Sequence, residues 1–192
     1  IAGDVFIHHY GSRSFIGNKI EHSSSMAANR KIFNQKWNGL DTQSPLGKKA
    51  LVLKTMENAN EANQRGQDSE AVNILVGGIK IFPEDKKLYY MLSEMLMDLK
   101  KYKEALEIIN EMVTDSNDRK KLELIGYCKE ALELYEEAEE YANRALLLDP
   151  ASPLALNLKG MLAYKKGDNS SAEKLFEKAI EEDPGYGEPY TN

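Results

Sequence analysis

The chain has 192 residues, of which 42% are apolar, enough for one large or two small domains with a buried core. Residues 1–50 carry seven basic and three acidic side chains, whereas residues 51–192 carry 18 basic and 28 acidic ones. This change in charge predicts a module boundary near residue 45. The acidic character of the second part argues against nucleic-acid binding there, because binding to phosphates requires a basic surface. No apolar run is long enough to span a bilayer. Cys128 is the single cysteine, so the chain can form neither an intrachain disulfide nor a cysteine-based zinc cluster. A lone cysteine fits a reducing, cytoplasmic setting.

The N-terminal stretch VFIHHY, residues 5–10, has the β-branched and aromatic composition of a short strand. Adjacent side chains on a strand point to opposite faces. We therefore do not expect His8 and His9 to bind one metal ion together.

The stretch SSSMAANRKIFNQKWNG, residues 23–39, comes next. Its serines can cap a helix, its apolar residues recur at helical spacing, and Gly39 can end that helix. We expect Phe33 and Trp37 to pack this helix against a neighbouring surface.

Taken together, these two stretches resemble the C-terminal edge of the catalytic domain of inverting family-2 glycosyltransferases, a bacterial type of enzyme. The matching element is His-x-Gly-Ser-x-Ser, at His9, Gly11, Ser12 and Ser14. In that family the histidine lies near the divalent metal and the pyrophosphate of the sugar nucleotide, so the resemblance implies that these four residues are substrate- and metal-proximal. The family's nucleotide-binding fold, acidic metal motif and catalytic base would lie upstream of Ile1.

The resemblance therefore implies no catalytic residue, metal site or cofactor in this chain, and a divalent metal and a nucleotide-sugar only in a parent protein. Residues 1–40 would be the remnant of that parent domain, and residues 41–51 the linker and the start of a first helix. A domain edge without its parent exposes apolar surface, so we expect residues 1–40 to be less stably held than the rest. That surface would favour self-association or docking on the neighbouring module.

Small residues recur with a fixed period from residue 52 onward. Ala71, Ala105, Ala138 and Ala172 are separated by 34, 33 and 34 residues, another small residue lies twelve positions before each, and a proline lies twelve positions after three of them. This period predicts a helix, a tight turn and a second, antiparallel helix in each unit. The small residues let the two helices approach closely, and proline ends the second helix.

The pattern resembles the tetratricopeptide repeat family, most clearly at residues 153–184, where Gly160, Gly167, Ala172, Phe176, Ala179 and Pro184 stand at motif positions. The expected units are 52–85, 86–118, 119–152 and 153–186. Residues 187–192 would begin a fifth unit, so we expect the natural chain to continue past Asn192. The resemblance implies an all-α fold, a right-handed solenoid of antiparallel helix pairs.

In this family the first helices line a concave groove. The implied groove residues are Asn60, Lys87, Tyr90, Glu94, Met97, Glu123, Tyr127, Asn157, Met161 and Tyr164. Glu94, Glu123 and Glu130 beside the tyrosines favour a basic protein or peptide as ligand. The residues with which co-chaperone members hold a peptide carboxylate match at only two of five positions, so a chaperone-tail receptor is not expected.

The function that these features favour is a scaffold for protein–protein interaction. It would be the C-terminal recognition region of a family-2 glycosyltransferase and would bind a partner or acceptor protein. The alternative is a free-standing adaptor whose N-terminal segment is a capping arm. In either case, we do not expect this chain alone to be an enzyme.

Overall fold

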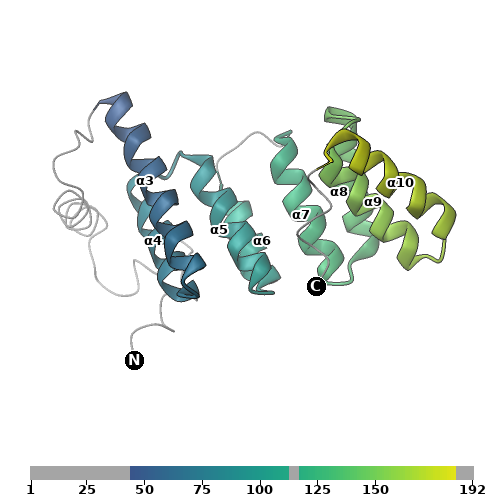
Figure 1. Ribbon diagram of the computed structural model, residues 1–192, viewed down its shortest axis with the longest axis horizontal. Helices are drawn as coiled ribbons and strands as arrows, with labels where there is room; N and C mark the ends of the chain where they lie inside the picture. Colours follow the sequence, from purple (N-terminus) through teal and green to yellow (C-terminus); the bar gives the residue numbers. More distant parts are fainter. Residues whose placement is uncertain (1–43, 113–116, 185–192) are drawn as a thin grey trace. The chain divides into compact units, whose positions relative to one another are not determined.

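The computed structural model describes residues 44–112 and 117–184, and the regular structure within those ranges is entirely helical (Figure 1). The chain divides into two compact units, residues 1–113 and 114–192. Unit 1 contains α3 (Pro45–Gln64), α4 (Asp68–Ile81), α5 (Lys86–Asp98) and α6 (Tyr102–Glu111). Unit 2 contains α7 (Arg119–Ala131), α8 (Tyr135–Leu148), α9 (Pro153–Lys165) and α10 (Asn169–Glu182). The strand and helix expected within residues 1–40, and the start of a fifth unit, lie outside the described residues.

The first helix of each pair begins at a side-chain cap. The capping residues are Ser44, Asp85, Asp118 and Ser152, and each accepts a hydrogen bond of 3.0–3.3 Å from a backbone N–H in the first turn. Proline occupies the first position of α3 and α9, where its missing N–H would have no partner within the helix. These caps fix where each pair starts.

The two helices of each pair are joined by three residues, and the middle one always has a positive φ: Gly66 71°, Lys100 59°, Glu133 62° and Gly167 82°. In the first turn, the Gly66 and Gln67 amides donate to the carbonyls of Asn63 and Ala62. The other three turns repeat this pattern, which satisfies the last carbonyls of a helix. Glycine occupies the middle of two of these turns, but Lys100 and Glu133 show that the same turn also forms without it.

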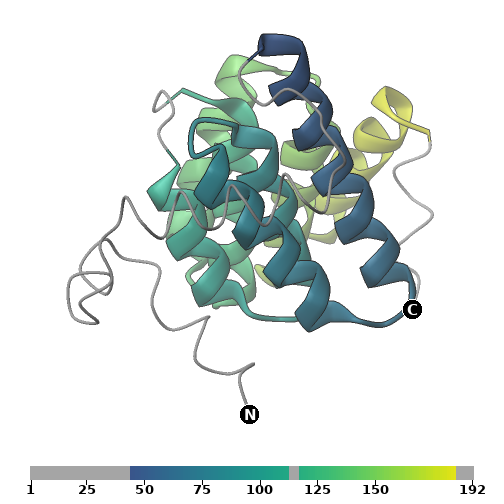
Figure 2. The same ribbon diagram turned by 90° about the vertical axis from the view of Figure 1, so that its left-hand side faces the viewer.

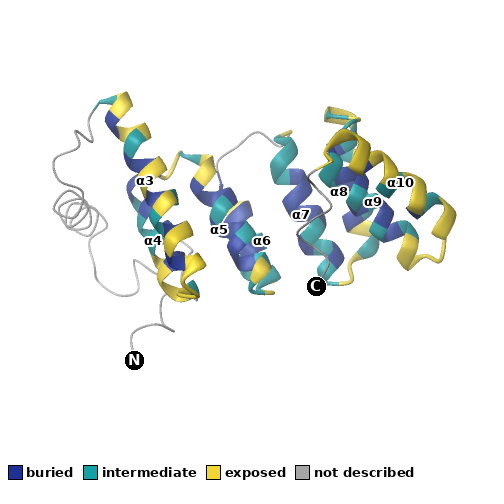
Figure 3. Ribbon diagram, viewed as in Figure 1, coloured by how far each residue is buried: buried dark blue, intermediate teal, exposed yellow. Residues whose placement is uncertain are grey.

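The periodic small residues lie where helices approach one another. Ala71, Ala105, Ala138 and Ala172 are all buried. In unit 1, α4 packs on α3 and α5, and α5 packs on α6; in unit 2, α8 packs on α7 and α9, and α9 packs on α10 (Figures 1 and 2). The buried residues lie along these contacts (Figure 3). The expected all-helical fold of paired helices is thereby confirmed for the described residues.

Helix α3 begins earlier than the repeat period indicates. The period places the first unit at residue 52, whereas α3 starts at Pro45 behind the Ser44 cap, so residues 45–51 are helical. Its first turns carry Leu46, 78% exposed. Within the described ranges no helix has the length and apolar character needed to cross a membrane.

Candidate functional site

In unit 2 the first helices α7 and α9 lie side by side and are joined through Tyr127. Its hydroxyl donates to the Leu154 carbonyl at 3.1 Å and accepts from the Asn157 amide nitrogen at 2.8 Å. The same amide nitrogen lies 3.7 Å from the Met161 sulfur. The Asn157 side chain is therefore oriented by its neighbours on both helices.

Tyr164 follows Met161 by three residues on α9 and is 62% exposed. Residues three and four apart share a side of a helix, so Asn157, Met161 and Tyr164 lie along one side of α9; we call these three residues the α9 face. It combines a fixed amide, a flexible thioether and an exposed aromatic ring. This combination can bury an apolar side chain and hydrogen-bond a main chain.

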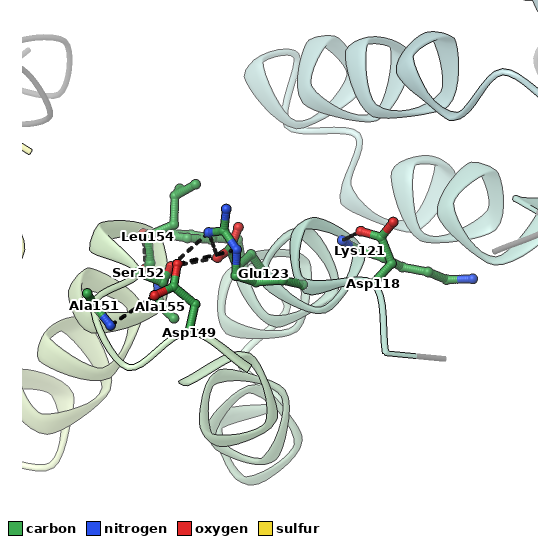
Figure 4. A network of polar contacts seen from close by, with 10 residues as sticks. Asp118, Lys121, Glu123, Asp149, Ala151, Ser152, Leu154 and Ala155 are labelled. Atoms are coloured by element: carbon green, nitrogen blue, oxygen red, sulfur yellow. Dashed lines mark hydrogen bonds and ion pairs between the residues drawn. The ribbon is translucent and has the colours of Figure 1, made fainter. Parts of the chain in front are cut away.

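A buried carboxylate lies on α7. Glu123 is only 1% exposed, and its Oε1 accepts 2.6 Å hydrogen bonds from Arg119 Nη1 and Ser152 Oγ (Figure 4). Ser152 Oγ in turn accepts from the Ala155 amide at 3.2 Å. Arg119 Nε lies 3.6 Å from Asp149 Oδ2. This network ties α7 to the connection between α8 and α9, so Glu123 stabilises the unit rather than presenting a charge to a ligand.

In unit 1 the first helix α5 carries two neighbouring acidic side chains. Glu94 and Asp98 are one turn apart on α5. Burial, and then the charge of Glu94, raise the pKa of the Asp98 carboxyl. This part of α5 therefore carries negative charge that a cationic group could offset.

Two stretches of the chain match models of a known family. One tetratricopeptide repeat model matches residues 129–187 and a second matches residues 86–114. These two stretches are tetratricopeptide repeats.

The chain is 27% identical over 141 residues, 71% of its length, to the TPR repeat-containing protein PA4667 of Pseudomonas aeruginosa, and spans 23% of that protein's length. Among solved structures, the TPR protein TTC0263 of Thermus thermophilus superposes with a TM-score of 0.61 at 16% identity, covering 69% of this chain and 75% of that one. The first TPR of Spaghetti (RPAP3), bound to the HSP90 peptide SRMEEVD, superposes with a TM-score of 0.54 at 24% identity, covering 60% and 93%. At these identities the structures show a shared fold.

The ten residues implied as a groove on the repeats differ widely in exposure. Asn60, Lys87 and Tyr164 are exposed, Glu94, Met97, Tyr127, Asn157 and Met161 are half-buried, and Tyr90 and Glu123 are buried. Tyr90, which the resemblance implies as a groove residue, is buried and so does not offer an exposed ring to a ligand. Glu130 is also nearly buried, with its carboxylate 3.9 Å from Lys165 Nζ, so in unit 2 both Glu123 and Glu130 lie beside a cation of the same unit. His9, Gly11, Ser12 and Ser14 lie outside the described residues.

Sequence reasoning missed the partners of Glu123. Arg119 lies four residues before Glu123, a spacing that indicates a helical ion pair, and Ser152 precedes Pro153, a sequence typical of a helix start. Each signal is present in the sequence, but the contact of both side chains with the Glu123 carboxylate depends on how α7 packs against α9.

Cys128 is buried, and burial raises the pKa of its thiol to about 12, so it is a packing residue and not a nucleophile. Within residues 44–112 and 117–184, no three His, Cys, Asp or Glu side chains are grouped closely enough to hold a metal ion.

The variant Tyr127→Phe should lower the free energy of unfolding by about 1 kcal/mol, because it removes the hydroxyl that bridges α7 and α9. Tyr135→Phe is the matched control, since Tyr135 is also half-buried in unit 2 and should change stability by less than about 0.5 kcal/mol. Urea titration of both variants makes the comparison. Equal effects would contradict a structural role for the Tyr127 hydroxyl.

Proposed function

We propose that this chain is a repeat scaffold that binds a partner protein, and that in unit 2 the partner contacts the α9 face. The observation that carries the proposal is the exposure of Tyr164 beside Met161 on a first helix. Exposed tyrosine offers a large contact area at little cost in conformational entropy, and methionine adapts to differently shaped partners. The peptide bound by the RPAP3 repeats supports recognition of a peptide segment.

The fixed position of Asn157 supports the same proposal. A side chain held before binding loses less conformational freedom when it meets a ligand. Tyr127 holds the Asn157 amide at 2.8 Å, so the amide can hydrogen-bond a partner main chain without first being ordered. Tyr127 acts here as a positioning residue, while Asn157, Met161 and Tyr164 make the contact.

We also propose that the partner is basic where it meets unit 1. The support comes from α5, where burial and the Glu94 charge raise the pKa of Asp98. A lysine or arginine placed beside these carboxylates would favour their charged forms. Unit 2 contributes little to this preference, because Arg119 already neutralises Glu123.

The parent protein is a further part of the proposal and rests on sequence resemblance alone. Residues 1–40, with His9, Gly11, Ser12 and Ser14, would close a family-2 glycosyltransferase domain whose divalent metal and nucleotide-sugar lie in the parent. In that arrangement the repeats would recruit a partner or acceptor protein in the cytoplasm. The alternative remains a free-standing adaptor whose N-terminal segment caps the repeats.

Binding can be tested with peptides selected from a random display library on the immobilised chain. Tyr164→Ala should weaken their binding about tenfold, equivalent to about 1.4 kcal/mol. Because Tyr164 is exposed, the same variant should leave the free energy of unfolding within about 0.5 kcal/mol of the original. Fluorescence anisotropy and urea titration measure the two quantities.

The matched control is Leu147→Ala, which truncates an 82% exposed apolar side chain on α8 and should leave binding unchanged. Replacing Lys and Arg in the selected peptides by Glu tests the basic preference. Selected peptides that bind Tyr164→Ala as tightly as the original chain would contradict the proposed contact surface.

A further inference from the structure

Helix α3 is apolar on two opposite sides. One side carries Leu51 and Thr55, both fully buried in unit 1. The other carries Leu46 and Leu53, and Leu53 is still half-exposed. Residues seven apart lie almost directly above one another on a helix, so Leu46 and Leu53 form a stripe two turns long; we call it the α3 stripe. A helix that covers only one core is expected to be polar on its outer side.

The α3 stripe is not a requirement of the repeat. At the repeat period, the residues that correspond to Leu53 are Lys87 in α5, Lys120 in α7 and Leu154 in α9, and Leu154 is only partly exposed. Leu46 lies in the N-terminal extension of α3, residues 45–51, which has no counterpart in α5, α7 or α9. Among the described first helices, only α3 has this extension and therefore the pair Leu46 and Leu53, at the point where the preceding chain enters the repeats.

We propose that residues 26–37 of the same chain pack on the α3 stripe. Met26, Phe33 and Trp37 recur at a spacing that places them on one side of a helix. Phe33 and Trp37 are the aromatic residues that most closely precede the exposed leucines in the sequence. Only residues 38–43 separate Trp37 from the Ser44 cap, a length common for connections between antiparallel helices. A tether this short holds the segment at an effective concentration on the order of millimolar.

The lengths of the two surfaces match in this arrangement. If the chain reverses within residues 38–43, Trp37 comes beside Leu46. Phe33 then lies about 6 Å further along α3, toward Leu53, which is about 10 Å from Leu46 at 1.5 Å per residue. Two large rings would therefore cover two leucines that are otherwise exposed.

This inference deepens the capping-arm alternative, on which it rests, and does not depend on ligand binding by the α9 face. It names the segment that forms the arm and the surface that receives the arm. If peptides fail to bind at Tyr164, the proposed packing of residues 26–37 on the α3 stripe still stands. If that packing is disproved, the proposed partner surface on α9 still stands.

Trp37 is the only tryptophan in the chain, so its fluorescence reports the contact directly in the full chain. We expect an emission maximum to the blue of that of the urea-denatured chain, and restricted quenching by acrylamide. The double variant Leu46→Glu with Leu53→Glu should shift the maximum to the red and raise the quenching constant. Both leucines are exposed on the repeats, so the far-ultraviolet circular dichroism should stay unchanged.

The matched control is Leu147→Glu, which places the same charge on an exposed leucine of α8 and should leave Trp37 emission unchanged. A second variant, Phe33→Ala, should shift the emission in the same direction as the double variant. The proposal is overturned if Trp37 already emits as in urea, if the double variant and the control behave alike, or if the blue shift disappears on dilution. The last result would identify a second copy of the chain as the occupant.

Discussion

Replacing Arg119 by methionine should lower the free energy of unfolding by about 3 kcal/mol. Arg119 Nη1 donates to the buried Glu123 carboxylate at 2.6 Å, and without it the carboxylate would remain buried with only the Ser152 hydroxyl as a donor. Removing one partner of a buried ion pair costs about 3–5 kcal/mol. We expect the lower end of this range because Arg119 is itself 41% exposed, so water can partly replace it.

The matched control is Arg144→Met. Arg144 lies on α8, is similarly exposed, and pairs with Glu140 at 4.0 Å, a surface contact that contributes at most about 1 kcal/mol. Replacing both members of the buried pair, with Arg119→Met and Glu123→Leu, should recover most of the loss because no unpaired charge remains. Urea titration compares the variants. A loss no larger for Arg119→Met than for Arg144→Met would show that the network carries little stability.

The adjacent glycines of α4 should respond to alanine in opposite directions. A Cβ at Gly77 meets no atom within 4 Å, whereas a Cβ at Gly78 would lie 2.7 Å from Thr55 Cγ2 and 3.3 Å from Leu88 Cδ1. Gly77→Ala should therefore raise the free energy of unfolding by about 0.5–1 kcal/mol, since alanine favours the helix. Gly78→Ala should lower it by about 1–3 kcal/mol through overpacking.

The surroundings of Gly78 have little freedom to adjust. Thr55 is fully buried, and its hydroxyl donates to the Leu51 carbonyl at 2.8 Å, which holds the side chain in place. Leu88 is fully buried as well. Each variant serves as the control for the other, since both make the same change in one helix. Thermal unfolding of the two should give midpoints on opposite sides of the original, and a shift in the same direction for both would refute the close contact between α3 and α4.

The helix pairs were predictable from sequence because two helices can pack closely only where the side chains between them are small. Ala71 and its counterparts are small because two backbones approach there, and the spacing shows in the sequence without any knowledge of the partner helix. The burial of Tyr90 was not predictable in the same way. Position in the repeat gave its side of the helix, but its exposure depends on the particular side chains around it.

The candidate site was predictable only in part for a similar reason. Tyr164 and Met161 follow from their repeat positions. Glu123 stands at the repeat position of Asn157, yet it is buried and hydrogen-bonded by Arg119 and Ser152. Such a network requires two residues of α7 to meet the capping residue that precedes α9, and a periodic pattern records each helix separately. The start of α3 within residues 41–51 was expected, but its first residue was not, because the Ser44–Pro45 signal that sets it lies outside the repeat period.

The four turns have a consequence for how arrays of this kind change in length. Each helix pair begins with its own capping side chain and reverses through its own three-residue turn, whether or not a glycine is present. The start and stop signals of a pair are therefore carried within its own stretch of chain. A duplication or deletion of one whole period joins the end of one pair to the capped start of another. An unequal crossover at the gene level can therefore add or remove a pair while every pair keeps the cap of its first helix.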